Sequence, residues 1–391
     1  MTNMNDSMTL EKKYLLPTYE KFPFVLERGE GCWVWAEDGT KYLDLYGGHA
    51  VAAIGHSPVE VTAAITKQSA KLLFYSNLVY NRARAEAAKA LVDFCGEDGS
   101  QVFFCNSGAE ANENAMRIAR SVTGKAKVVV AEGGFHGRTA GAVAATGLKY
   151  RKDLAGLGAD IVHVPFGDLD AAAEALKGAA AFLLEPIQSV QGCTTAAEEY
   201  LKGLQRLCEE TGSLLIFDEV QTGLGRVGAP SARHAFGARP HLQTFAKALA
   251  SGVPAGAVLV APEAAAKVKP GQLGSTFGGG PLACVAISAT IKAIVDKELT
   301  KNAAEMEELI RATFKFAPIR EIRGKGLLLG LVLDRPSKPI RDALLKKKII
   351  VGGADDAHAI RLLPPLTVGA TEIGLLRGAL EEIFAAETVT A

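Results

Sequence analysis

The chain has 391 residues, which at roughly 150 residues per domain corresponds to about two or three domains. Its 43 lysine and arginine residues balance 43 aspartate and glutamate residues, so the charge gives no reason to expect nucleic acid or an anionic membrane as a partner. With 48% hydrophobic and 22% charged residues, the composition excludes a disordered chain and is typical of a compact globular protein.

The N-terminus and the cysteines indicate the compartment. The first ten residues are polar and include Asp6, and no apolar segment of a signal peptide follows them. No apolar run approaches the roughly 20 residues that a membrane span needs. The six cysteines are too widely spaced for a metal-binding pair and too few for a disulfide scaffold. We therefore expect a cytoplasmic protein with no metal site.

Residues 31–45 read as a small hairpin with a turn at Asp38 and Gly39. From about residue 100, short apolar runs alternate with amphipathic segments of helix length. The runs are 101–105, 127–130, 160–164, 181–184, 214–217, 243–246 and 256–260. Continuous apolar strands separated by helices predict an α/β fold with a mostly parallel, seven-stranded sheet covered on both faces.

After residue 281 the pattern changes to a long helix rich in Ala and Ile, followed by shorter strands and helices. We expect three parts: an N-terminal segment (1–50) that packs with the small domain, a large domain (51–280) and a smaller C-terminal α+β domain (281–391). The lysines at 346–348 are predicted to end a solvent-facing helix, where their charge complements the helix dipole.

Ligands of open parallel sheets bind beyond the carboxyl ends of the strands, so the residues after each run are candidates for a site. The run 101–105 leads into Ser107, Gly108 and Ala109 at the start of a predicted helix. Their backbone N–H groups and the helix dipole suit a phosphate group. Simple capping of the helix by Asn106 or Ser107 explains the same residues equally well.

The run 127–130 leads into Phe135, His136 and Arg138. An aromatic ring and a guanidinium beside a glycine turn suit a flat, anionic ligand, although a plain surface loop is at least as consistent with these residues. The run 214–217 leads into Asp218 and Glu219, which are costly beside a buried strand unless they are paired. A cationic partner for Asp218 is expected, because metal ligands are not evident nearby.

The segment GLGRVG (223–228) matches a dinucleotide-binding pattern, but neither a regular helix nor an acid about twenty residues later follows it. That interpretation is rejected. In the same acid-free stretch, Lys247 stands among Phe245, Ala246 and Leu249. A desolvated lysine has a lowered pKa and makes a Schiff-base nucleophile, whereas an ordinary lysine with its charge in solvent is the common alternative.

An aspartate after one strand, a lysine some thirty residues later and a glycine–helix phosphate site are what pyridoxal phosphate requires. Six segments closely resemble the class III aminotransferases of fold type I: FCNSGAEANENAMRIAR, GGFHGRT, LLEPIQ, LLIFDEVQTGLGR, TFAKALASGVPAGAVL and GSTFGGGPLA. The resemblance runs from about Gly29 to the end and is strongest to the acetylornithine aminotransferase group. It implies pyridoxal 5'-phosphate as the cofactor.

The resemblance implies a role for each matching residue around the cofactor. Lys247 would hold the cofactor covalently and then act as acid and base. Asp218 would pair with the protonated pyridine nitrogen, and Gln221 would bond the phenolic oxygen. Phe135 would stack on the ring, and Glu185 would be an acid close to the cofactor.

Further roles concern the phosphate, the substrate and the assembly. Ser107, Gly108 and Ala109 would bind the phosphate. Thr276 would reach the phosphate of a neighbouring subunit, which implies a homodimer with shared active sites. The two arginines that resemble the carboxylate-binding residues of the family are Arg138 and Arg361.

The chain departs from the family pattern at three positions. Val190 stands where a glutamate is usual, Gly280 replaces an asparagine, and His49 replaces a small or aliphatic residue. Val190 cannot pair with Arg361 as the glutamate can, so that arginine would stay open to carboxylates unless Gln188 or Gln191 satisfies it.

The leading hypothesis is amino transfer between an N-acylated diamino acid, such as N-acetylornithine, and 2-oxoglutarate. The alternative is a pyridoxal phosphate enzyme of α-amino acids, such as an α-aminotransferase, racemase or aminomutase. A non-catalytic protein on the same scaffold would be expected to lose Lys247 first, so the lysine disfavours it. The expected partners are amino-acid and 2-oxo-acid substrates and a second copy of the chain.

Overall fold

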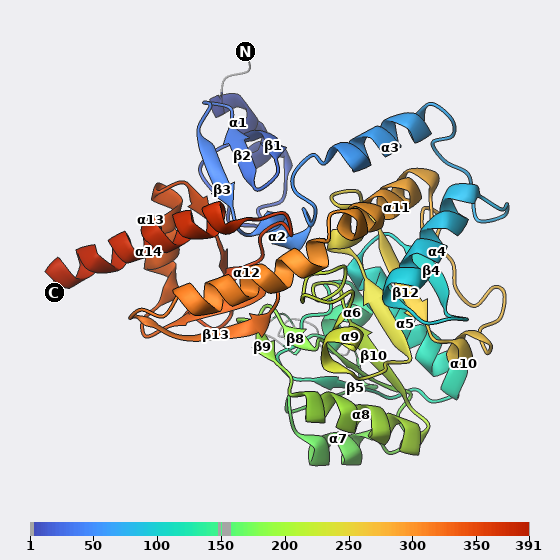
Figure 1. The fold of residues 1–391 in the computed structure, drawn as a ribbon. Coiled ribbons are helices and arrows are strands. Elements are labelled where there is room, and N and C mark those ends of the chain that lie inside the picture. Colours follow the sequence, from blue (N-terminus) through green and yellow to red (C-terminus); the bar gives the residue numbers. More distant parts are fainter. Residues whose placement is uncertain (1–3, 148–149, 151–157, 391) are drawn as a thin grey trace.

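The computed structural model describes residues 4–147, 150 and 158–390, and these residues form a large sheet of seven strands (Figure 1). The strands are β4 (Gln101–Cys105), β5 (Val128–Ala131), β6 (Ile161–Val164), β7 (Ala181–Leu184), β10 (Leu214–Asp218), β11 (Leu242–Phe245) and β12 (Gly256–Val260). Their order is β4-β12-β11-β10-β7-β5-β6. Only β12 is antiparallel to its neighbours. The predicted mostly parallel α/β sheet is confirmed.

Helices cover both faces of this sheet because successive side chains of a strand point to opposite faces. Val130 packs with the apolar face of α5 (Gly108–Thr123), whereas its neighbour Val129 lies in the cluster that contains residues of α7 (Leu169–Leu176) and α8 (Glu198–Thr211). The helix α5 starts at Ser107, whose hydroxyl accepts from the N–H of Glu110, and ends at Gly124 with a positive φ.

Further elements complete this part of the chain. They are the helices α3 (Val59–Ser69), α4 (Arg82–Cys95), α6 (Ala140–Ala145), α9 (Ala232–Phe236), α10 (Pro262–Ala265) and α11 (Pro281–Asp296), the 3₁₀ helix η2 (Lys247–Ala250) and the short strands β8 (Ile187–Gln188) and β9 (Thr194–Thr195). The long helix α11 lies against α3, α4 and η2. It therefore covers the turn that carries Lys247.

The N-terminal segment builds a small sheet together with a strand from near the other end of the chain. After α1 (Met4–Tyr14), the strands β1 (Leu26–Glu30), β2 (Trp33–Ala36) and β3 (Lys41–Asp44) form an antiparallel sheet, and β15 (Ile349–Ile350) pairs parallel with β3. The predicted turn at Asp38 and Gly39 is confirmed, and the Asp38 carboxylate accepts from the N–H of Thr40.

The C-terminal part contains a second sheet, in the order β13 (Ile319–Lys325), β14 (Leu328–Leu333), β17 (Ala359–Leu362) and β16 (Gly352–Gly353). The helices are α12 (Leu299–Thr313), α13 (Ser337–Lys346) and α14 (Ala370–Thr390). Lys346 ends α13, as the sequence predicts.

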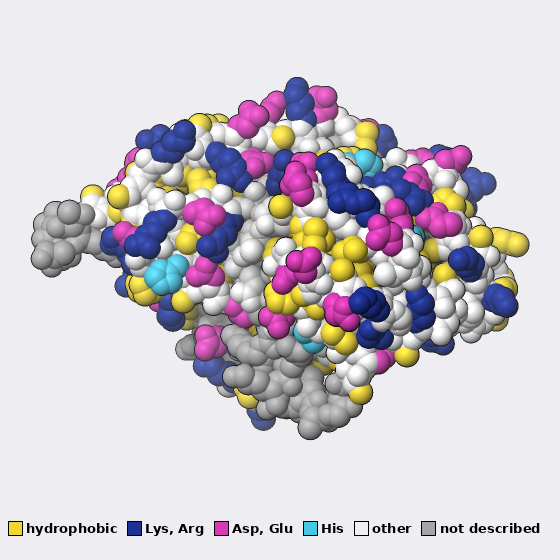
Figure 2. All heavy atoms as spheres, turned by 90° about the horizontal axis from the view of Figure 1, so that it is seen from below, with side chains coloured by type: hydrophobic (Ala, Val, Ile, Leu, Met, Phe, Trp, Pro, Cys, Tyr) yellow, Lys and Arg dark blue, Asp and Glu magenta, His cyan; other side chains and the backbone are white. Residues whose placement is uncertain are grey.

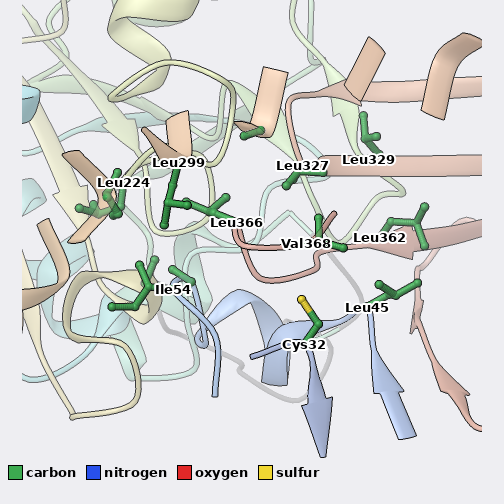
Figure 3. Close-up of a cluster of buried hydrophobic side chains, with 14 of the residues drawn as sticks. Cys32, Leu45, Ile54, Leu224, Leu299, Leu327, Leu329, Leu362, Leu366 and Val368 are labelled. Atoms are coloured by element: carbon green, nitrogen blue, oxygen red, sulfur yellow. The ribbon is translucent and has the colours of Figure 1, made fainter. Parts of the chain in front are cut away.

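A common core joins the two ends of the chain. Cys32, Leu45 and Ile54 lie with side chains from the C-terminal part, among them Leu366 and Val368 (Figure 3). The N-terminal part of the chain therefore packs against side chains of the C-terminal part. The boundaries proposed for the three parts stay a prediction.

Lysine and arginine side chains are interspersed with aspartate and glutamate on the face shown in Figure 2, so this face does not present a field of one sign. Among the described helices, none combines the length and the apolar character that a membrane crossing demands.

Candidate active site

A cavity of about 350 Å³ opens at the carboxyl ends of the parallel strands, where ligands of such sheets bind. Residues that follow five different strands line it: Asn106, Ser107, Gly108 and Ala109 after β4, Phe135 and His136 after β5, Glu185 after β7, Val220 and Gln221 after β10, and Ala246 and Lys247 after β11. The structure therefore brings most of the residues singled out in the sequence into one site.

Asp218, the last residue of β10, is buried at this cavity and is held from three sides. Its Oδ2 accepts from Nδ2 of Asn112 at 2.7 Å and from Nδ1 of His136 at 2.8 Å. Its Oδ1 accepts from the N–H of Val220 at 3.1 Å. Asn112 in turn accepts from the hydroxyl of Thr244 at 2.7 Å. The carboxylate is thus fixed by α5, by the loop after β5 and by the neighbouring strand β11.

The partners of Asp218 were only partly foreseen. The sequence pattern places His136 at a strand end, but it does not mark Asn112 as part of the site. Asn112 could have been found as a polar amide on the apolar face of α5, next to the fully buried Ala111, because a buried amide needs hydrogen-bond partners. Because a carboxylate only accepts, Nδ1 of His136 carries a proton. Within the described residues, its other ring nitrogen is buried without a partner.

Lys247 begins η2 and lines the cavity. Burial lowers the pKa of its amino group, and the charge of Arg361 adds to this effect, whereas Asp218 and Glu185 oppose it. The residue has a positive φ of 43°, which costs conformational energy for a side chain of this size. The desolvated lysine expected from the sequence is what the structure contains.

Glu185 is a buried acid beside the same cavity. Its Oε1 accepts from the N–H of Phe135 at 2.7 Å, which positions the loop that carries the aromatic ring. Burial, reinforced by the charge of Asp218, raises the pKa of Glu185 to about 7, while His136, the Phe135 N–H and Lys247 oppose the rise.

The turn after β4 caps a helix and also borders the cavity, while its role in binding a phosphate stays a prediction. The Ser107 hydroxyl caps α5, and Ser107, Gly108 and Ala109 also line the cavity at the helix N-terminus. The first N–H groups of a helix lack partners within the helix, and its dipole favours an anion there. Across the cavity, Gln221 accepts from the hydroxyl of Ser189 at 3.0 Å, so the amide nitrogen of Gln221 is not engaged in that bond.

Three predicted site residues are not among those that line the cavity of the single chain: Thr276, Arg138 and Arg361. Thr276 is exposed and does not line it. Arg138 is also exposed, and its guanidinium lies over the rings of Tyr150 at 4.9 Å and Tyr19 at 5.7 Å.

Arg361 is buried, and it contacts Ser189, which also bonds the cavity residue Gln221. It donates to the hydroxyl of Tyr46 at 2.6 Å, to the hydroxyl of Ser189 at 3.2 Å and to the carbonyl of Gly353 at 2.5 Å. Among the described residues, no carboxylate lies within ion-pair distance of its guanidinium. The hydroxyl groups of Tyr46 and Ser189, not the amides of Gln188 or Gln191, are therefore the side-chain partners of Arg361. The Gln188 amide donates to the carbonyl of Glu132.

A lysine and an aspartate at neighbouring strand ends, facing the N-terminus of a helix, define a site for pyridoxal phosphate chemistry. The family model of the class-III aminotransferases matches residues 14–384, and the chain belongs to this family. Aminotransferases of this class work with pyridoxal 5'-phosphate as their cofactor.

The similar proteins cover nearly the whole chain. The acetylornithine aminotransferase of Methanothermobacter thermautotrophicus is 41% identical over 371 residues, which are 93% of this chain and 94% of that protein. The crystal structure of ornithine aminotransferase from Toxoplasma gondii ME49 matches with a TM-score of 0.93 at 28% identity, covering 100% of this chain and 97% of the other. Acetylornithine aminotransferase from Elizabethkingia anophelis matches with a TM-score of 0.85 at 30% identity, covering 98% and 100%.

Proposed function

We propose that this enzyme transfers the side-chain amino group of N-acetylornithine, or of a closely similar N-acylated diamino acid, to 2-oxoglutarate. The observation that carries the proposal is the presence of Lys247 and Asp218 in one cavity at the N-terminus of α5. The names of similar relatives, which are acetylornithine aminotransferases, support the choice of amine.

The residues present fit pyridoxal phosphate by their donor chemistry. When bound, the cofactor supplies an electron-withdrawing ring that stabilises the negative charge left on the substrate carbon after it loses a proton. Lys247 would hold it through Nζ, because a lowered pKa leaves more of this amine unprotonated and nucleophilic. The same Nζ, once free, would accept the proton of the substrate carbon and return it.

Asp218 would face the ring nitrogen. Its Oδ2 is engaged by Asn112 and His136, while its Oδ1 accepts one backbone N–H and keeps a lone pair for a further donor. Gln221 would offer its amide nitrogen to the phenolic oxygen, and Phe135 would cover the ring. The backbone N–H groups of the turn after β4 would bind the phosphate.

Substrate carboxylates would be bound by Arg361 and Arg138. Arg361 is suited to this because it is buried and its contacts are neutral acceptors. A guanidinium binds a carboxylate with two parallel hydrogen bonds, which fixes the substrate's orientation as well as its position.

We further propose a homodimer with shared active sites. A large apolar surface is exposed on the single chain at residues 72–80, including Leu78 at 91% and Tyr80 at 106% of full exposure. It continues into the loop of Thr276, because Asn77 donates to two carbonyls of that loop and the Phe74 and Phe277 rings lie 5.2 Å apart. Contiguous apolar surface of this kind marks an interaction site. A partner copy seated there would bring its Thr276 to the active site.

A cytoplasmic location is proposed as well. Within the described chain all six cysteines are buried free thiols, which suits a reducing compartment.

The reaction is tested by an amino-donor screen with 2-oxoglutarate. N-acetylornithine should give the highest kcat/KM, ahead of ornithine, 4-aminobutyrate and α-amino acids such as alanine. Exclusive use of α-amino acids would contradict the proposal. Borohydride reduction followed by peptide mass analysis should place one cofactor on the peptide of Lys247 and none in a Lys247→Ala variant. Label on a different lysine would overturn the assignment of that residue.

A further inference from the structure

The helix α2 (Gly47–Ala50) is a single left-handed turn. The φ angles of its residues lie between 55° and 65°. Backbone bonds of 2.9 Å, from Ala50 to Tyr46 and from Val51 to Gly47, close the turn. A left-handed conformation costs about 1–2 kcal/mol for each residue other than glycine. His49 and Ala50 therefore keep it only because the surroundings enforce it, which is common at functional sites.

The start of the turn is fixed by Asp44. Its Oδ1 accepts from the N–H groups of Tyr46 and Gly47 at 2.9 Å, and its Oδ2 lies 2.8 Å from Nε2 of His56. The Tyr46 ring fits only because residue 352 is a glycine, since a Cβ atom there would be 2.1 Å from the ring. Asp44 thus holds the backbone of Tyr46, and the distant Gly352 leaves room for its ring.

Tyr46 connects Arg361 to His49. Nη2 of Arg361 donates to the Tyr46 hydroxyl at 2.6 Å, and this hydroxyl is 3.0 Å from Nδ1 of His49. A guanidinium can only donate, so the phenol accepts from Arg361, and in the arrangement we infer it directs its own proton to Nδ1 of His49. Nδ1 of His49 is then an acceptor, and the proton of the neutral ring must be on Nε2. The inferred chain of hydrogen bonds runs from Arg361 through Tyr46 and ends at the Nε2–H of His49.

The charges around His49 favour the same neutral state. Partial burial of the ring lowers its pKa, and the positive charges of Arg361, Lys247 and Arg138 lower it further, while Asp44 opposes them. The side chain nevertheless stays accessible in the single chain. The permanently charged guanidinium groups of Arg361 and Arg138, together with this accessible donor, attract a carboxylate.

We propose that His49 is a specificity-determining residue whose Nε2–H donates a hydrogen bond to a carboxylate oxygen of the amino-acid substrate. Tyr46 is the positioning residue that fixes the direction of this donor. The inference rests on the proposed function for the identity of the amine, but the hydrogen-bond chain and its carboxylate preference can be measured without that reaction.

The kinetic test compares N-acetylornithine with N-acetyl-1,4-diaminobutane, which lacks only the carboxylate. The variant His49→Gly suits the left-handed backbone and removes the ring. We expect it to lower kcat/KM for N-acetylornithine about 10- to 160-fold, the range for a hydrogen bond to a charged group, and to leave the decarboxylated amine unaffected. His49→Gln, which keeps an N–H donor, should recover part of the loss. An equal loss with both amines would overturn the proposal.

Two measurements on the holoenzyme separate this proposal from the reaction. In NMR spectra of protein with ¹⁵N-labelled histidine, the ring signals of His49 are identified by their loss in His49→Gln. These signals should be those of the Nε2–H tautomer, and in Tyr46→Phe they should shift toward a mixture of the Nε2–H and Nδ1–H tautomers. Glutarate, a dicarboxylate that cannot be transaminated, should bind more weakly to His49→Gly in calorimetry. An Nδ1–H tautomer or unchanged glutarate binding would refute the role of His49. Failure of wild type to use N-acetylornithine, with these two results intact, would instead refute the proposed amine.

Discussion

Asn112 and Asp218 are 106 positions apart in the chain, yet the amide of Asn112 donates to Oδ2 of the aspartate at 2.7 Å. The Oδ1 atom of the same Asn112 side chain accepts from the hydroxyl of Thr244 on β11, the strand next to β10. Residues of one helix and two strands therefore fix the position of the Asp218 carboxylate. A buried hydrogen-bond network of this kind keeps its geometry well, because a displacement of the carboxylate would leave polar groups unsatisfied.

Replacement of Asn112 by alanine should weaken this network. Asp218 would lose one donor and Thr244 its acceptor, so we expect the free energy of unfolding to fall by about 1–3 kcal/mol. Urea unfolding of the cofactor-free protein measures the change. The matched control is Asn114→Ala in the same helix, where the amide donates to the carbonyl of Glu110. If both variants lose the same stability, the network contributes nothing beyond the helix itself.

Glu185 should make stability fall as the pH rises. Its pKa in the folded protein is raised from 4.5 to about 7, so within this window the folded state holds a proton that the unfolded chain releases. The free energy of unfolding therefore decreases as the pH rises from about 4.5 to about 7. Glu185→Gln keeps the acceptor for the Phe135 N–H but cannot ionise.

Urea unfolding of the cofactor-free forms between pH 4.5 and pH 8 tests this expectation. The stability of Glu185→Gln relative to wild type should grow across the window and then level off. Glu199→Gln, on the exposed start of α8, should follow wild type. A Glu185→Gln variant with the same pH dependence as wild type would show that the acid is already ionised at low pH.

A glutamate at position 190 should change the choice of amine. Val190 adjoins Ser189, which bonds Arg361, and it is partly buried in the turn between β8 and β9. A carboxylate there could pair with Arg361 and mask it while an amine without an α-carboxylate is bound. Val190→Glu should therefore raise kcat/KM for 4-aminobutyrate relative to glutamate, by up to about 10- to 160-fold.

The control for this change is Val190→Gln, which has the same shape without the charge. It should leave the ratio of the two amines near that of wild type. Identical ratios for the glutamate and glutamine variants would mean that masking of Arg361 does not operate in this enzyme.

Hybrid dimers should recover activity that the parent variants lack. Lys247→Ala destroys its own site, and Thr276→Ala is expected to damage the site of the partner. In a mixed dimer, one site then combines an intact Lys247 with an intact Thr276. Mixing Lys247→Ala with Lys247→Arg should restore nothing, and serves as the control. Sedimentation that shows a fully active monomer would refute the shared site.

Much of the large sheet could be predicted because buried parallel strands are continuous apolar runs, and the residues that follow them were read directly as site candidates. Lys247 and Asp218 were found in this way. Asn112 was missed because its burial depends on β10, which comes a hundred residues later. The Tyr46–Arg361 contact joins residues 315 positions apart, and local patterns contain no information on such pairs. The role of Thr276 stays a prediction, because it depends on a second copy of the chain.

The pairing of β3 with β15 also affects how the protein is made on the ribosome. The last strand of the large sheet ends at Val260. The fourth strand of the N-terminal sheet consists of Ile349 and Ile350, which are synthesised about 90 residues later. At about 5–20 residues per second, this interval lasts roughly 5–20 s. During that time the first 45 residues lack their partner strand, whereas all seven strands of the large sheet have been synthesised and can pair. Stalled chains ending near residue 300 should therefore be cleaved by protease within the N-terminal segment first, and full-length chains should lose that sensitivity.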